Sequence, residues 1–213
     1  MKAILAMMAA LCCLSLPLQA QAWGQRGHGA IGVLAVEQLQ PGTREALNQI
    51  LGNTDFDTVV GACIWPDIWR GLGDGIDTAT WHYVNIDPDE IAYSRRRDCP
   101  EKQCVTEVIN IQAGILADLE QSPEDRRLAF KNLCHFTADL HQPLHVGYAD
   151  DQGGNLITIR YRGDSMNLHR YWDSGLIDSQ VDSLDELLSI LRDRPNQAPV
   201  GWQPGDTYAW TNE

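Results

Sequence analysis

The sequence has few basic residues for its length. Its 213 residues include 16 Lys and Arg against 29 Asp and Glu, which gives a formal net charge of −13. Proteins that hold a nucleic-acid backbone tightly gain much of their affinity from Lys and Arg, so this composition argues against a static nucleic-acid binder. It does not argue against an enzyme, which must release its product, and carboxylates that bind metal cations are not free negative charge.

Long apolar segments are absent apart from one at the N-terminus. Residues 3–18 are almost wholly apolar, and Ala20-Gln21-Ala22 then supplies the small-x-small pattern that signal peptidase recognises. The segment is too short for a transmembrane helix, which needs about 20 apolar residues. We therefore predict a signal peptide over residues 1–22, with cleavage before Trp23.

The predicted cleavage leaves a mature protein of one domain, residues 23–213, in the periplasm or outside the cell. No other apolar stretch is long enough to span a membrane, so we expect no stable membrane association after cleavage. A lipid anchor at Cys12 is an alternative, although Leu11 is a poor residue at such a junction.

The Cys-x-x-Cys spacing of cysteine zinc sites is also absent. After removal of residues 1–22, four cysteines remain, an even number in an oxidising compartment. Cys99 and Cys104 bracket a short loop, and we predict a disulfide between them. Cys63 and Cys134 form either a second disulfide or two buried free thiols, and the sequence leaves both open.

Internal repeats, low-complexity tracts and Pro/Gly-rich linkers are absent, which favours a single domain. Apolar residues at helical spacing and local cap signals predict helices over 27–39, 42–51, 56–65, 105–120, from Ser122 to about His141, 167–177 and 183–192. Alternation over 156–162 between turn signals predicts a strand, and so at most a small β-hairpin. The expected fold is an all-α domain.

Histidine and aspartate recur at a spacing of four residues. His135 and Asp139 share one face of a predicted helix, and His169 and Asp173 repeat the pattern on another. His145 follows the first pair in the turn after a proline, close enough to aim back at the same region. A single pair of this kind is commonly a surface hydrogen bond, but two pairs with a third histidine favour zinc in a hydrolytic site.

Two further polar residues stand inside aromatic runs. Asp67 lies in the segment WPDIW and His82 in WHYV. Polar groups in such surroundings are either hydrogen-bonded core residues or ligands, and local sequence does not decide between these interpretations.

Six segments together resemble one family. WGQRGH, WPDIWR, WHYVN, HFTADLHQPLHVG, GGN and NLHRYWD occur in family order across most of residues 23–173. They resemble the S1/P1 nuclease family (the mung bean nuclease type), which is related to bacterial zinc phospholipase C. The resemblance implies a helical domain with a trinuclear zinc site in a cleft.

The resemblance implies nine ligands for three Zn²⁺ ions. One ion would be held by His28 and by the α-amine and carbonyl oxygen of Trp23. The α-amine is free only after the signal peptide has been removed. Asp139 would bridge this ion to a second one. The second ion would have the ligands Asp67, His82, His135 and Asp139, and the third would have His145, His169 and Asp173.

The resemblance also implies the activity and the substrate contacts. Asp67, Asp139 and Arg70 would be the catalytic residues, with Arg70 on the phosphate. Tyr83 would stack on a base, and Asn85, where some relatives have aspartate, can only hydrogen-bond to substrate. The implied protein is a monomeric endonuclease that cuts single-stranded DNA and RNA to 5′-phosphorylated products and is also a 3′-nucleotidase.

Two alternatives and one departure accompany this interpretation. A zinc phospholipase C would use the same metal chemistry, but its pattern ends in glutamate where this chain has Asp173. A zinc-binding protein without catalysis would have a saturated coordination shell. Family members usually continue beyond the AWTNE segment that ends at Glu213, so the chain is either a naturally short member or truncated.

Overall fold

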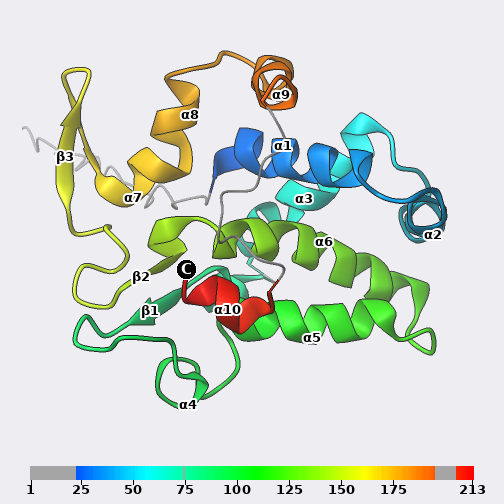
Figure 1. Cartoon of the computed structure of the whole chain (residues 1–213), viewed down its shortest axis with the longest axis horizontal. Helices are drawn as coiled ribbons and strands as arrows, with labels where there is room; N and C mark the ends of the chain where they lie inside the picture. The colour runs from blue at the N-terminus through cyan, green and yellow to red at the C-terminus, as the bar shows by residue number, and fades with distance from the viewer. Residues whose placement is uncertain (1–22, 74, 195–204) are drawn as a thin grey trace, which may run out of the picture.

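The structure is a computed structural model that describes residues 23–73, 75–194 and 205–213. The predicted signal peptide, residues 1–22, lies outside the described residues. Within them the fold is mainly helical, as the sequence predicted, and it contains two small sheets where the sequence predicted one hairpin at most (Figure 1). Among these residues, no helix combines the length and the apolar character that crossing a membrane requires.

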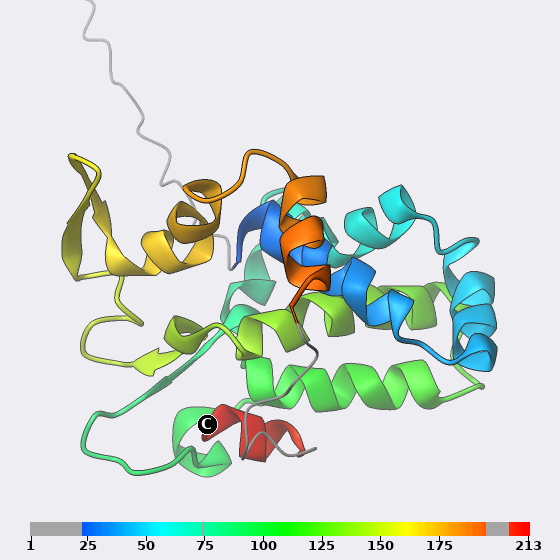
Figure 2. The ribbon, with the colours of Figure 1, turned by 45° about the horizontal axis from the view of Figure 1, so that its top comes forward.

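Four helices form the centre of the domain: α1 (Gly24–Glu37), α3 (Phe56–Arg70), α5 (Val105–Ala117) and α6 (Pro123–Leu140). α6 lies in the middle, with α5 along one side and α1 and α3 on the other (Figures 1 and 2). One apolar cluster includes Val105 and Phe136 between α5 and α6. A second includes Val33 and Val59 between α1 and α3.

α6 begins and ends where the sequence predicted. The Ser122 side chain accepts a hydrogen bond from the Asp125 backbone, and proline occupies the first helical turn. The helix stops at Leu140 because Gln142, the residue before Pro143, has an extended backbone with ψ of 115°. The last two turns of α6 therefore carry its functional side chains to the edge of the core.

α3 is longer than the predicted helix over 56–65. It continues through Pro66 to Arg70, although the proline ring removes one backbone hydrogen bond. α3 packs against both α1 and α6, and this tertiary packing overrides the local preference to end at the proline. The extension places Asp67 and Arg70 on a helix instead of in a loop.

The remaining helices are short. They are α2 (Pro41–Leu51), η1 (Ile76–His82), α4 (Arg95–Asp98), η2 (Pro143–His145), α7 (Leu168–Arg170), the π-helix η3 (Tyr171–Gly175), α8 (Leu176–Asp178), α9 (Leu184–Arg192) and α10 (Thr207–Thr211). The predicted helix over 167–177 is thus three consecutive pieces with a π-helical turn in the middle. Such turns are often found at functional sites.

Two pairs of strands complete the fold. β3 (Thr158–Tyr161) and β4 (Asp164–Asn167) form the predicted antiparallel hairpin. β1 (Val84–Ile86) and β2 (Val146–Tyr148) form a parallel pair that the sequence did not predict. This second pair brings two distant segments of the chain side by side.

Both pairs of cysteines are bonded. The predicted disulfide Cys99–Cys104 is confirmed, and Cys63–Cys134, which the sequence left open, links α3 to α6. The second bridge passes close to α1, where a Cβ at Gly32 would collide with the Cys63 sulfur. Glycine therefore lets α1 approach the bridge.

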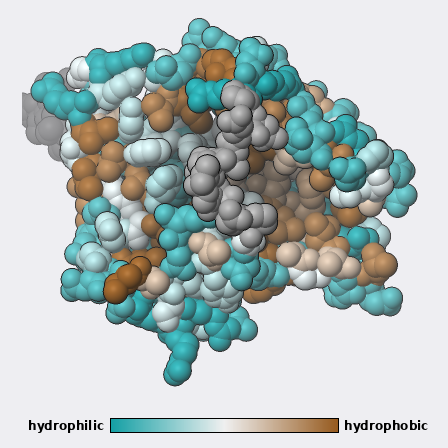
Figure 3. All heavy atoms as spheres, viewed as in Figure 1, coloured by the Kyte–Doolittle hydropathy of each residue, from teal (hydrophilic) through white to brown (hydrophobic). Residues whose placement is uncertain are grey.

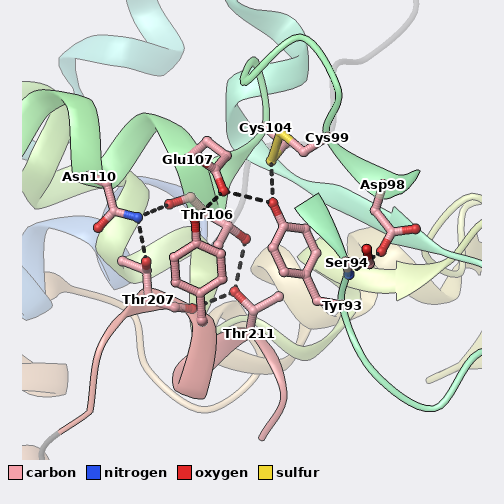
Figure 4. The surroundings of a disulfide bond; sticks show 11 residues. Tyr93, Ser94, Asp98, Cys99, Cys104, Thr106, Glu107, Asn110, Thr207 and Thr211 are labelled. Atoms are coloured by element: carbon pink, nitrogen blue, oxygen red, sulfur yellow. Dashed lines mark hydrogen bonds between the residues drawn. A yellow bond between two sulfur atoms is a disulfide. The ribbon is translucent and has the colours of Figure 1, made fainter. Parts of the chain in front are cut away.

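A polar network attaches α10 to α5 beside the first disulfide (Figure 4). The buried Glu107 carboxylate accepts hydrogen bonds from the phenols of Tyr93, at 3.1 Å, and Tyr208, at 2.8 Å. The hydroxyls of Thr106 and Thr211 lie 2.8 Å apart. Burial and the Glu107 charge raise the pKa of Tyr93, so its phenol remains a donor across the physiological range.

On the face shown in Figure 3, hydrophobic side chains gather over the region that α1 and α6 occupy in Figure 1, and hydrophilic side chains surround them.

Candidate metal centre

Three groups of buried histidine and aspartate side chains lie where the N-terminal end of α1, the C-terminal end of α6 and α7 converge (Figures 1 and 2). In each group the possible ligand atoms lie within 4.8 Å of one another. The groups are His28–Asp67–His135, His82–His135–Asp139 and His145–His169–Asp173. The residues from the two four-residue repeats and from the aromatic runs thus come together in one region.

Asp139, of the second group, faces histidines of both the first and the second group. Its Oδ1 lies 3.3 Å from His28 Nε2, and its Oδ2 lies 3.0 Å from His82 Nδ1 and 3.3 Å from His135 Nε2. Asp67 Oδ1 lies 3.7 Å from the same nitrogens of His82 and His135. The two oxygens of one carboxylate therefore face different histidines, an arrangement suited to a ligand that bridges two ions.

The third group is built from η2, α7 and η3. Asp173 Oδ2 lies 3.3 Å from His169 Nε2, and Oδ1 lies 3.6 Å from His145 Nε2. The two imidazole rings stack, with centroids 4.9 Å apart. The group is joined to the others through His145, whose Nδ1 donates to the His82 carbonyl at 2.6 Å. The parallel pairing of β1 and β2 makes this contact possible, since His82 and His145 lie just before those strands.

Unpaired polar atoms indicate that the residues fit a cation. Seven buried nitrogen and oxygen atoms in these groups have no hydrogen-bond partner among the described residues: His28 Nδ1 and Nε2, Asp67 Oδ1, His82 Nε2, Asp139 Oδ1, His145 Nε2 and Asp173 Oδ2. Buried polar atoms without partners are rare and call for an ion or water. Three buried carboxylates in one region also need positive charge nearby. The donor set of imidazole nitrogen and carboxylate oxygen suits zinc.

Backbone carbonyls fix the orientation of three rings. His135 Nδ1 donates to the Cys63 carbonyl at 2.8 Å, and His169 Nδ1 donates to the Gly153 carbonyl at 2.7 Å. His145 makes the equivalent bond to the His82 carbonyl. A carbonyl can only accept, so the proton of each neutral ring is on Nδ1, and Nε2, which faces a carboxylate, is the nitrogen that can bind a metal. Metal-binding histidines are usually held in this way.

Glycine is needed at one of these contacts. Gly153 has a φ of 60°, and a Cβ there would collide with the Leu144 carbonyl oxygen. The GGN segment thus has a physical role: it brings a carbonyl against His169.

The protonation equilibria of the metal-free groups reflect burial and mutual interaction. Burial lowers the pKa of His28 and His82 to about 4, so both are neutral near pH 7, the form that binds metal. Burial also disfavours protonation of His135, but the Asp139 and Asp67 carboxylates outweigh it and raise the pKa. Burial raises the pKa of Asp67. A metal would compete with the proton that His135 retains.

Trp23 lies at the start of α1 with a φ of 45°. Its indole Nε1 donates to the Ala138 carbonyl at 2.8 Å, directly before Asp139 in the chain. This bond holds the first residue of the predicted mature chain beside the central carboxylate.

A cleft of about 670 Å³ is lined by His82 of the second group and by His145 and His169 of the third. Its lining also includes the three predicted substrate contacts, Arg70, Tyr83 and Asn85. These contacts therefore share one cavity with ligand candidates. Arg70 Nη2 lies 3.1 Å from Asp67 Oδ1. The Tyr83 ring is 38% exposed.

The lining also contains Gln152 and Asn155, which the sequence interpretation did not assign. Their sequence signals were the turn over residues 151–154, which contains Gln152, and the GGN segment, which ends in Asn155. Gln152 has a φ of 54°, an uncommon backbone conformation for a residue other than glycine. The sixth histidine, His141, is exposed; its Nδ1 bonds to the Thr137 carbonyl and its ring lies beside Trp210.

The model of one protein family, described as S1/P1 Nuclease, matches residues 23–213. The chain belongs to the S1/P1 nuclease family. The S1/P1 nuclease relatives include Endonuclease 3 of Arabidopsis thaliana, 29% identical in an alignment of 195 residues that covers 88% of this chain and 66% of the relative. Endonuclease 4 of the same plant is 32% identical over 169 residues, 75% of this chain and 56% of the relative. Nuclease P1 of Penicillium citrinum is 29% identical over 201 residues, 88% of this chain and 74% of the relative.

The chain spans about two thirds of the length of Endonuclease 3 and less of Endonuclease 4. The matched part contains all nine residues that the S1/P1 nuclease resemblance implied as ligands, because they lie between Trp23 and Asp173.

Proposed function

We propose that the protein is an exported zinc-dependent endonuclease that hydrolyses phosphodiester bonds in single-stranded DNA and RNA, leaves 5′-phosphates and also acts as a 3′-nucleotidase. One observation carries the proposal: in a chain of the S1/P1 nuclease family, three buried His/Asp groups with unpaired ligand atoms lie together, and histidines of two of the groups line one cleft.

The proposed ligands are the residues of the three groups together with Trp23. Trp23, His28 and Asp139 would hold one Zn²⁺, and Asp67, His82, His135 and Asp139 would hold a second. His145, His169 and Asp173 would hold the third. Zn²⁺ held there would act as a Lewis acid toward the phosphate and generate the nucleophile from water near neutral pH.

The protein's own side chains bind and orient the substrate. Arg70 donates from its planar guanidinium to the phosphate oxygens, where charge develops during displacement. The Asp67 carboxylate beside it, at 3.1 Å, holds the guanidinium at the edge of the metal groups. The Asn85 amide hydrogen-bonds to the substrate in the same cleft.

Tyr83 provides a reason for acting on single strands. Its exposed ring lines both the main cleft and a neighbouring pocket of about 330 Å³. Stacking of a base on an aromatic side chain contributes roughly 1–3 kcal/mol, and an unpaired base is free to make this contact.

The test is hydrolysis of single-stranded DNA, RNA and a phosphatidylcholine analogue by the protein purified after export, with and without a chelator. We expect chelator-sensitive cleavage of the nucleic acids and not of the lipid. Hydrolysis of the lipid alone would instead identify a phospholipase C, and bound zinc with no hydrolysis would identify a zinc-binding protein.

A pair of variants tests the cleft. Arg70→Ala should lower kcat/KM for single-stranded DNA by about 10²–10³, whereas Arg160→Ala, which removes an exposed arginine on β3, should leave it unchanged. Equal effects of the two substitutions would show that the arginines act only through general charge.

A further inference from the structure

Gln142 is a fully buried glutamine between two parts of the metal centre. It follows α6 and precedes Pro143, and its side chain is 0% exposed. Its Oε1 accepts a hydrogen bond from the Leu144 backbone at 2.6 Å, and its Nε2 donates to Asp173 Oδ1 at 2.5 Å. The two partners fix the orientation of the amide, since a backbone N–H needs an acceptor and a carboxylate needs a donor.

Each bond acts on a different ligand of the third group. Leu144 directly precedes His145 in η2, so the first bond holds the turn that carries His145. The second bond holds the carboxylate of Asp173, which η3 supplies from 31 residues further along the chain. Within the part of the chain that the structure describes, Gln142 thus bridges the turn of one ligand and the side chain of another.

The bond to Asp173 also distinguishes its two oxygens. Oδ1 accepts from Gln142, whereas Oδ2 has no hydrogen-bond partner among the described residues and lies 3.3 Å from His169 Nε2. A carboxylate whose one oxygen is occupied by a strong donor presents the other to a cation. The third group then offers Asp173 Oδ2, His145 Nε2 and His169 Nε2.

We propose that Gln142 is a positioning residue for the third metal ion: it directs Asp173 to bind through Oδ2 alone and holds the turn of His145 in place. This inference rests on the proposed metal-dependent function. Outer partners of metal ligands commonly change metal affinity by 10–100-fold when they are replaced.

The experiment compares Gln142→Met with the parent protein, both purified after export. Methionine is similar in size and apolar, so the variant loses both hydrogen bonds with little change in volume. Gln112→Met is the matched control, because Gln112 is also a buried glutamine but lies on α5, outside the three groups. Zinc per chain is measured by elemental analysis, and affinity by competition with a chromophoric chelator.

We expect the affinity for one of three ions to fall 10–100-fold in Gln142→Met, with the other two retained and the control unchanged. The visible spectrum of the cobalt-substituted protein should lose the contribution of one ion. Urea unfolding of the metal-free proteins separates this effect from a general loss of stability, because a purely structural role would lower stability and weaken all three ions alike.

Gln142→Glu provides a second test if the methionine variant does not fold. It keeps an acceptor for Leu144 but places a carboxylate where the donor to Asp173 was, so the third ion should again bind at least 10-fold more weakly. Parent-like affinity in either variant, or equal weakening of all three ions, would overturn the inference. A parent protein that binds no zinc would instead refute the proposed function, so the two failures are distinguishable.

Discussion

The Cys63–Cys134 disulfide should contribute about twice as much stability as Cys99–Cys104. A disulfide lowers the conformational entropy of the unfolded chain by an amount that grows with the logarithm of the loop it closes. The two bridges close loops with sequence separations of 71 and 5 residues. The chain-entropy relation then gives about 4 kcal/mol for the first and about 2 kcal/mol for the second.

The perturbation is a pair of double variants, Cys63→Ala/Cys134→Ala and Cys99→Ala/Cys104→Ala. Urea unfolding at equilibrium gives the free energy of unfolding and the m-value for each. The measurement is made with a chelator present, because the backbone carbonyl of Cys63 accepts the Nδ1 hydrogen of His135, and a shift of α3 after loss of the bridge would disturb metal binding. In the metal-free protein the difference reports on the bridges themselves.

A larger loss in the first double variant, by about 2 kcal/mol, is the expected result. An equal or larger loss in the second would refute the loop-entropy reasoning. It would show that the short bridge stabilises the folded network around Tyr93 and Glu107 by more than the long bridge destabilises the unfolded chain (Figure 4).

Three further results are expected. An alanine added before Trp23 converts the α-amine of that residue into a peptide nitrogen. Elemental analysis should then give two zinc ions per chain instead of three. A count of three ions would exclude the amine as a ligand. With a chelator present, the free energy of unfolding should fall as the pH falls from 6.5 toward about 4. The reason is that the unfolded chain protonates His28 and His82 in this range while the folded state keeps them neutral. A free energy that does not change with pH would contradict the burial of both histidines as neutral groups. Tyr93→Phe should lower the free energy of unfolding by about 1–2 kcal/mol and Tyr208→Phe by less than about 1 kcal/mol, as measured by urea unfolding. The difference is expected because Tyr93 is 8% exposed and Tyr208 is 40% exposed. A larger loss for Tyr208→Phe would contradict the assigned network.

Local sequence signals were sufficient for parts of the fold. The serine cap and the proline after Gln142 predicted both ends of α6, and the four-residue spacing placed His135 and Asp139 on one face. The predicted strand over 156–162 overlaps β3 of the observed hairpin. These features depend on interactions within a few residues, which a sequence displays directly.

Other features depend on contacts between distant segments. The parallel strands β1 and β2 are three residues each, too short to leave a periodic pattern, yet their pairing places His82 next to His145. The continuation of α3 through Pro66 follows from its packing against α1 and α6.

The outer partners of the candidate site were also beyond sequence reasoning. In the sequence, Gln142 is only the residue before Pro143, where a helix ends, because its bond to Asp173 crosses 31 positions of the chain. The pairing of Cys63 with Cys134 crosses 71. Gln152 and Asn155 lie in or next to a predicted turn, but the local pattern did not indicate that this turn lines the cleft.

The most direct test of the proposed metal centre is to count its ions and relate them to activity in one preparation. Protein purified after export should contain about three zinc ions per chain, lose cleavage of single-stranded DNA when they are removed by a chelator, and regain it when zinc is restored. Protein that contains no divalent metal, or that cleaves DNA equally well after complete removal of its metal, would contradict the account.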